Sequence, residues 1–104
     1  MTRAEFAAQL ETTKIPVYFD HAPSGTVAPF LIYKWDYDNF GADNRAYQRI
    51  ASVTVEHYHY DYSDGADVKA VFDENDLFWS CSSGYNSSEK LYTEIYTMEV
   101  LENG

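Results

Sequence analysis

The sequence predicts an α+β fold, in which a mostly antiparallel β-sheet carries two α-helices packed on one face. Three observations predict it: a long strand pattern at 47–60, a second at 91–101, and two short segments with apolar residues at helical spacing. The 104 residues suffice for one domain with one core, so we expect 1–104 to fold as a single unit.

Segment 47–60 (YQRIASVTVEHYHY) is predicted as the central strand, because β-branched and aromatic residues fill it and no Gly or Pro interrupts it. Successive side chains of a strand point to opposite faces of the sheet. The set expected to face the core is Ala51, Val53, Val55 and His57, and the opposite set is Ile50, Ser52, Thr54, Glu56 and Tyr58. Segment 91–101 (LYTEIYTMEVL) is predicted as a second long strand.

Two segments predict helices. The first starts with a capping box at Thr2 and Glu5, and it carries an apolar pair, Phe6 and Leu10, four residues apart. The second covers 65–75, and we expect Ser63 or Asp64 to cap it. Its apolar residues recur at the spacing of one buried helical stripe; they are Val68, Val71 and Phe72.

Shorter segments complete the predicted sheet. Segment 15–19 is apolar, but Pro16 cannot donate to a ladder, which favours an edge strand. Segment 29–36 (PFLIYKWD) has apolar residues on both faces, so it needs cover on both sides, and a neighbouring subunit is one source of cover. Segment 37–45 (YDNFGADNR) is predicted as a long hairpin loop. Segment 78–83 is predicted as a short strand that leads into a hairpin turn at 82–88 (SSGYNSS).

Charge and cysteine usage exclude several classes of function. The formal net charge is −10, from 17 acidic and 7 basic residues, so electrostatic binding to a nucleic-acid backbone is not expected. The single cysteine, Cys81, leaves no intramolecular disulfide and no cysteine-based zinc cage. No apolar run approaches the ~20 residues of a membrane span, and the N-terminal residues lack the apolar region of a signal peptide. We therefore expect a soluble protein that is made in the cytoplasm.

One group of residues has the chemistry of a metal site. His57, His59 and Asp61 fall on one face if the strand runs straight, and two imidazoles with a carboxylate are a legitimate set of metal ligands. Against this reading, all three come from one strand and tyrosines surround them. The sequence favours histidines that pack beside tyrosines, so we expect no metal, no cofactor and no enzymatic activity. A metal enzyme built on the three residues is the alternative.

Ten tyrosines are more amphipathic rings than the interior of so small a domain can hold. Tyrosine suits surfaces that are apolar on one side and wet on the other, and protein interfaces use it heavily. The alternative is that these rings cover the sheet within one chain. The residues expected at a subunit interface are Phe30, Ile32, Tyr33, Trp35, Tyr92 and Tyr96.

Two stretches carry a resemblance to a known family, namely 52–72 (SVTVEHYHYDYSDGADVKAVF) and 87–101 (SSEKLYTEIYTMEVL). Together they resemble the tail terminator, or tail completion, proteins of long-tailed bacteriophages. In that family a V-x-V-E-x-Y strand precedes a short helix, and an E-x-L-Y-x-x-x-Y strand closes the chain. The matching positions are Val53, Val55, Glu56, Tyr58, Glu89, Leu91, Tyr92 and Tyr96. Segments 14–23 (KIPVYFDHAP) and 29–33 (PFLIY) are also similar, whereas His57 stands where the family often has an apolar residue.

The resemblance implies a subunit of a homohexameric ring at the head-proximal end of the tail tube, which terminates tube polymerisation and provides the interface for head-to-tail joining. The implied partners are copies of the chain itself, the tail tube protein and a head completion or connector protein. DNA is expected to pass through the lumen without specific binding, and no membrane is involved. The implied location is the virion, at the head–tail interface, with host cytoplasm as the place of assembly.

A set of residues in and beside the predicted hairpin loop is expected to face the lumen or a tube subunit; it comprises Asp36, Tyr37, Asp38, Phe40, Asp43 and Arg45. Two other functions stay open. One is a head completion protein that docks on the portal. The other is an acidic DNA mimic that inhibits a host DNA-binding protein, because spaced carboxylates can imitate phosphates.

Overall fold

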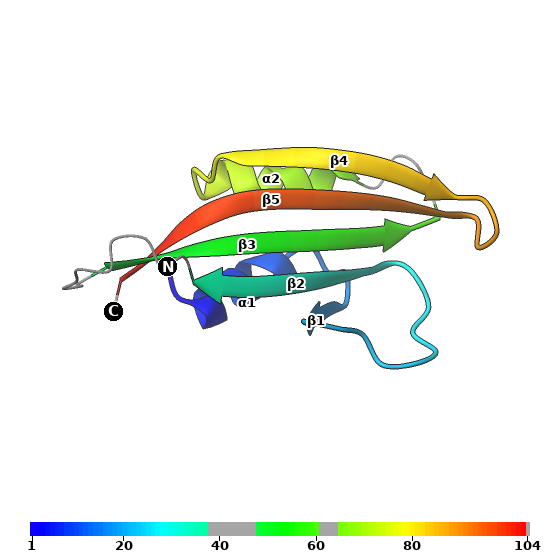
Figure 1. Ribbon diagram of the computed structural model, residues 1–104, viewed down its shortest axis with the longest axis horizontal. Coiled ribbons are helices and arrows are strands. Elements are labelled where there is room, and N and C mark those ends of the chain that lie inside the picture. Colours follow the sequence, from blue (N-terminus) through cyan, green and yellow to red (C-terminus); the bar gives the residue numbers. More distant parts are fainter. Residues whose placement is uncertain (38–47, 61–64, 104) are drawn as a thin grey trace.

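The structure is a computed structural model that describes residues 1–37, 48–60 and 65–103. Its elements in chain order are α1 (Arg3–Glu11), β1 (Val17–Phe19), β2 (Phe30–Tyr37), β3 (Gln48–His59), α2 (Ala66–Glu74), β4 (Trp79–Asn86) and β5 (Leu91–Asn103). The strands form one sheet in the order β1-β2-β3-β5-β4 (Figure 1). Strand β1 is parallel to β2, while the pairs β2–β3, β3–β5 and β4–β5 are antiparallel. The predicted α+β class and mostly antiparallel sheet are confirmed.

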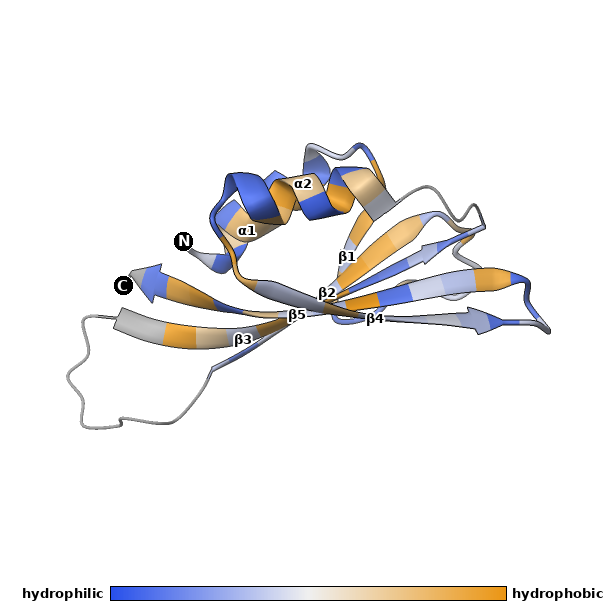
Figure 2. Ribbon diagram, turned by 90° about the horizontal axis from the view of Figure 1, so that it is seen from above, coloured by the Kyte–Doolittle hydropathy of each residue, from blue (hydrophilic) through white to orange (hydrophobic). Residues whose placement is uncertain are grey.

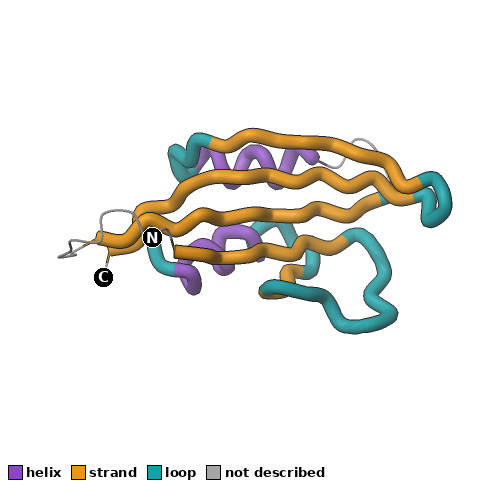
Figure 3. The backbone as a smooth tube through the Cα atoms, viewed as in Figure 1, coloured by secondary structure: helices purple, strands orange, loops and turns teal. Residues whose placement is uncertain are grey.

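Both helices lie on the same face of the sheet, and the described residues leave the opposite face open (Figure 2). Strands β3 and β5 run side by side along the longest dimension of the molecule, which is 47 Å (Figure 3). An antiparallel sheet can keep one face packed on a core and expose the other. We call the side of the sheet that carries the helices the helix face, and the opposite side the open face.

The core lies between the helix face and the two helices. Strand β3 is central, and its side chains alternate as predicted, with Val53 and Val55 fully buried and Ile50 exposed on the open face. The apolar core residues are Phe6, Leu10, Leu31, Tyr33, Trp35, Ala51, Val53, Val55, Val68, Val71, Phe72, Tyr96, Met98 and Val100. Phe6 of α1 stacks on Phe72 of α2 with 6.5 Å between ring centroids. Burial of each such ring contributes about 1.5–3 kcal/mol to folding.

The two helices begin differently. Helix α1 has the predicted capping box: the Glu5 amide donates to Thr2 Oγ1 at 3.2 Å, and the Thr2 amide donates to Glu5 Oε1 at 2.8 Å. Helix α2 begins after Gly65, which offers no side-chain cap. Ser63 and Asp64, the residues predicted to cap this helix, lie outside the described ranges, so that cap stays a prediction. Within those ranges, no helix has the length and apolar character needed to cross a lipid bilayer.

The turn predicted at 82–88 is wrong in its placement. Strand β4 continues to Asn86, which pairs with Leu91 at the start of β5. The turn therefore occupies residues 87–90. Asn86 Oδ1 closes this turn by accepting hydrogen bonds from the Ser88 and Glu89 amides. Small polar residues favour turns, but pairing with a long partner strand overrides that weak local preference. The hairpin loop predicted at 37–45 lies, except for Tyr37, outside the described residues.

Three residues expected at a subunit interface lie in the core instead. Tyr33, Trp35 and Tyr96 sit on the helix face and are 7%, 8% and 0% exposed. The helices of the same chain cover them, so they offer no surface to a neighbour. Phe30 and Ile32 point to the open face; Phe30 is half-buried there, whereas Ile32 is only 8% exposed, so of the two Phe30 is the side chain that a neighbour can reach. Their part in an interface stays a prediction.

The remaining predicted contact residues divide between the described and the undescribed parts of the chain. Tyr92 is half-buried on the helix face, beside His59. Asp36 and Tyr37 are exposed at the end of β2. Asp38, Phe40, Asp43 and Arg45 belong to a segment, 38–47, that the structure does not describe.

Candidate functional site

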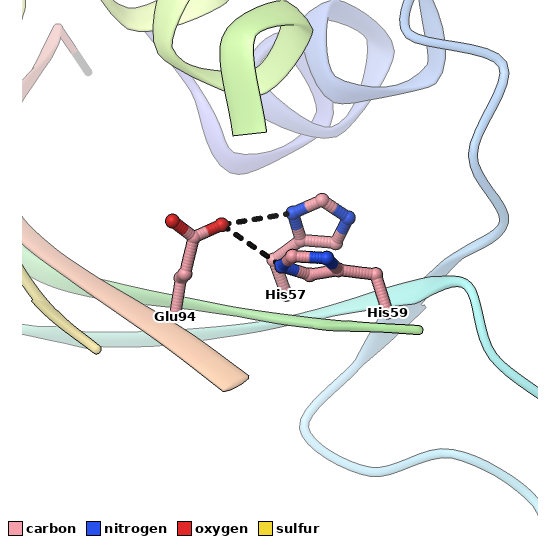
Figure 4. A group of neighbouring side chains, drawn as sticks. All are labelled: His57, His59 and Glu94. Carbon is pink, nitrogen blue, oxygen red and sulfur yellow. Dashed lines mark hydrogen bonds and ion pairs between the residues drawn. The ribbon is translucent and has the colours of Figure 1, made fainter. Parts of the chain in front are cut away.

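Two central strands bring a histidine pair and a carboxylate together on the helix face. His57 and His59 are two positions apart on β3, so both point to the same side. The register of β3 and β5 places Glu94 directly opposite His57. Figure 4 shows the three side chains rising from the sheet toward the helices and converging on one another. The site, which we call the His–His–Glu cluster, consists of His57, His59 and Glu94.

The polar atoms of the cluster are close together. Glu94 Oε1 is 3.0 Å from His59 Nε2 and 3.6 Å from His57 Nδ1 (Figure 4). One ligand-type atom from each residue can be chosen so that all three lie within 4.8 Å of one another. The two imidazole rings are 4.2 Å apart between centroids, and the Tyr92 ring stacks on His59 at 5.9 Å. The geometry allows one small ion to contact all three side chains.

Burial makes this cluster unusual. The His57 side chain is fully buried and that of His59 is 1% exposed, while Glu94 is 14% exposed. Among residues 1–37, 48–60 and 65–103, neither ring nitrogen of His57 has a hydrogen-bond partner, since its 3.6 Å contact with Glu94 is longer than a hydrogen bond. A buried polar group without a partner typically destabilises a fold by about 1–3 kcal/mol. His57 therefore opposes folding unless something else binds its nitrogens.

The surroundings of His57 disfavour its protonated, positively charged form. Burial and, after it, the neighbouring charge of His59 lower the pKa of His57 to about 4, while Glu94 acts in the opposite direction. His57 is therefore neutral at pH 7. Burial also raises the pKa of Tyr96, with the Glu94 charge as the next cause. Within the described part of the chain, the Tyr96 hydroxyl has no partner with hydrogen-bond geometry.

The start of α2 leaves room for the carboxylate. A Cβ added at Gly65 would lie 2.9 Å from Glu94 Oε1, closer than real Cβ contacts come. Gly65 has a φ of −78°, which any residue can adopt, so glycine serves here for space and not for backbone conformation. The absent side chain lets Glu94 reach the histidines beneath the first turn of the helix.

Only part of this cluster could be predicted from the sequence. His57 and His59 were the expected pair, and the structure brings them together, but Asp61 lies outside the described residues. The third member, Glu94, was missed because it lies 35 residues from His59 in the chain. A signal was available: alternation in β5 puts Glu94 on the same face as Tyr96, Met98 and Val100, where a charge is out of place.

A second surface lies on the other side of the sheet. A groove of about 830 Å³ runs along β3 and β5 on the open face. Its apolar lining includes Ile50, Phe78 and Leu101, which are 40%, 95% and 53% exposed. Next to it, β4 forms one edge of the sheet, and seven of its eight residues are exposed, including the predicted strand residue Cys81.

The sequence has no significant match among protein-family models, and a search of curated proteins gives no match either.

Proposed function

We propose that the chain is a structural subunit of a long-tailed bacteriophage, and that it assembles with copies of itself into a ring at the head-proximal end of the tail tube. There it ends tube growth and gives the head a surface to join. Two arguments support this proposal. One is the resemblance of 52–72 and 87–101 to tail terminator proteins; the other is the character of the β4 edge.

The β4 edge is the observation that carries the proposal. Its sequence, WSCSSGYN, contains no charged residue and no proline, although the whole chain has a net charge of −10. An exposed edge strand presents unpaired backbone groups to any passing strand, and natural proteins usually protect such edges with charges, prolines or bulges. An eight-residue edge without a charge is suited to pairing with another chain.

A second copy of the chain is the partner that fits this edge. Subunits with the same large negative charge repel each other, so a surface that lacks charge is where they can approach with the least repulsion. The β4 edge is such a surface, and Phe78, at 95% exposure, adds an apolar side chain next to it. Two different patches that meet head-to-tail generate a ring when the rotation closes. Phe30, half-buried on the open face above the buried Ile32, remains a candidate for the second patch.

The proposed position also suits the charge of the chain. A ring built from subunits of net charge −10 surrounds its lumen with negative potential, which weakens adhesion of DNA that passes through. Asp36, exposed at the end of β2, belongs to the surface that we expect at the lumen or at a tube subunit.

The direct test is electron microscopy of phage that lack this protein. We expect tubes of uncontrolled length, or finished tails that do not join heads, and restoration by the protein supplied in trans. The two defects also distinguish a tail-side ring from a head-side completion protein. Normal tails joined to heads would contradict the proposal, as would tight, salt-sensitive binding to a basic host protein in place of virion association.

A variant pair tests the interface. Phe78→Ser removes an exposed ring beside β4, and Val27→Ser is the matched control, because Val27 is 71% exposed in the segment between β1 and β2. We expect Phe78→Ser to reduce ring formation, or decoration of tube ends, at least about fivefold, since loss of an aromatic anchor at the centre of an interface weakens it by more than ~1 kcal/mol. Val27→Ser should assemble normally. Equal behaviour of the two variants would contradict the proposed interface.

A further inference from the structure

The His–His–Glu cluster has no part in the proposed ring. It lies beneath α2 on the helix face, whereas the proposed contacts use the β4 edge and the open face. Its chemistry is nevertheless specific, because three side chains with metal-ligating atoms converge beside a core that consists mainly of aliphatic and aromatic side chains. It therefore needs an explanation of its own.

We infer that His57, His59 and Glu94 bind a single divalent ion of the zinc class. Ligand atoms lie about 2.0–2.1 Å from zinc, so neighbouring ligands of a tetrahedral site are roughly 3.3–3.4 Å apart. The two distances from Glu94 Oε1, 3.0 Å to His59 Nε2 and 3.6 Å to His57 Nδ1, lie on either side of that spacing. The third separation, between the two histidine nitrogens, is within 4.8 Å, so the imidazole rings must draw closer together for all three atoms to reach one ion.

The donor set also matches this class of ion. Two imidazole nitrogens and one carboxylate oxygen suit zinc and other first-row divalent metals, whereas calcium and magnesium prefer oxygen ligands throughout. The ion would use a nitrogen of His57 that makes no hydrogen bond within the described part of the chain. Its two positive charges would also offset the buried carboxylate of Glu94.

The position of the cluster indicates what the ion does. His57 and His59 belong to β3 and Glu94 to β5, so one ion joins the two central strands beneath the start of α2. Three protein ligands leave a fourth position on a tetrahedral ion for water or another small ligand. We assign the ion a stabilising role in the folded subunit, and this role does not depend on ring formation.

The first experiment measures metal binding by the full chain without an affinity tag, after removal of metal with a chelator. Calorimetric titration with Zn²⁺ should give one ion per chain. Co²⁺ should give the intense visible absorption of a tetrahedral site. A hundredfold excess of Zn²⁺ over its dissociation constant should raise Tm by roughly 10 °C. Absence of stoichiometric binding by either ion would overturn the inference and would leave the cluster as a proton-binding group only.

Variants locate the ion. His57→Leu removes one ligand and keeps a side chain of similar size, so it should fold and lose both the Co²⁺ absorption and the Tm increase. His21→Leu is the matched control, because the His21 side chain is 82% exposed beside Asp20 and offers the same ring at the surface. Loss of binding in His21→Leu, or retention in His57→Leu, would overturn the assignment.

Gly65→Ala tests how the carboxylate is positioned. The added Cβ would displace Glu94 Oε1 without removing any ligand. We expect folding to persist, by circular dichroism, and zinc affinity to fall about tenfold, the usual scale for disturbed support of a metal ligand. Unchanged zinc affinity in this variant would contradict the part assigned to Glu94.

Discussion

The helix face of the sheet has two regions that differ in chemistry although the same two strands build them. In one region Val53 and Val55 of β3 pack with Phe6 and Phe72 from the helices, and all four are at most 1% exposed. In the other region the same strand carries the buried His57, opposite Glu94 of β5. Alternation and burial are the same in both regions, and only the side chains differ.

Burial has opposite effects on the folding free energy in the two regions. The apolar region gains free energy when its side chains leave water, so its sequence is explained by folding alone. The polar region loses free energy, because His57 is buried without a hydrogen-bond partner. Side chains that oppose folding at a central strand are better explained by binding than by stability.

The largest expected effect belongs to the apolar region. Phe72→Ala should lower the free energy of unfolding by about 3–5 kcal/mol, because it leaves a cavity among the rings that Phe72 contacts. These rings are Phe6, Trp79 and Tyr96. Urea denaturation measures the change.

Phe78→Ala is the control for that measurement. Phe78 is 95% exposed, so its truncation should change the free energy of unfolding by less than about 0.5 kcal/mol at concentrations where the chain is monomeric. Similar losses in Phe72→Ala and Phe78→Ala would mean that the core is not where the structure places it.

The next effect belongs to the polar region and depends on pH. His57 has a pKa of about 4 in the folded protein and an ordinary value of 6.5 when exposed, so unfolding takes up a proton between these two pH values. The unfolding free energy therefore does not depend on His57 titration above pH 6.5, and it decreases as the pH falls from 6.5 toward 4. The loss amounts to about 3 kcal/mol.

Acidic side chains also change the stability in this pH range, but they are the same in the wild type and in His57→Leu. Comparing the two proteins therefore isolates the contribution of His57. As the pH falls from 7 to 4, metal-free wild type should lose about 3 kcal/mol more unfolding free energy than His57→Leu does, because only the wild type has the His57 ring to protonate. A difference that stays constant over this range would show that His57 titrates normally in the folded protein.

The smallest effect belongs to the boundary between α2 and the sheet. Gly65→Ala should change metal-free stability by no more than about 1 kcal/mol, because the atom that the new Cβ meets is the end of a flexible side chain, Glu94. Thermal unfolding with a chelator present measures it. A loss of several kcal/mol would mean that the carboxylate is fixed by contacts other than those with the histidines.

Local signals predicted most of the fold. The capping box at Thr2 and Glu5, the stripe of α2 and the alternation of β3 each depend on residues a few positions apart, and each was confirmed. The full length of β4 was not predicted, because Gly84 to Asn86, which follow the predicted strand 78–83, form a strand only through pairing with β5. Such pairing is a property of two segments together, so composition of either one does not reveal it.

The cluster was half predicted for the same reason. His57 and His59 are neighbours on one strand, so alternation alone places them together. Glu94 joins them only through the register of β3 with β5, which the sequence does not specify directly. The interface prediction failed at Tyr33 and Tyr96 because aromatic content does not say which face the helices cover.

The most direct test of the contrast between the two regions is the stability of metal-free His57→Leu at pH 7, measured by urea denaturation against the wild type. Replacing a buried ring that has no hydrogen-bond partner with an apolar side chain of similar size should raise the free energy of unfolding by about 1–3 kcal/mol. A less stable variant would contradict the account, because His57 would then support the fold as Val53 and Val55 do.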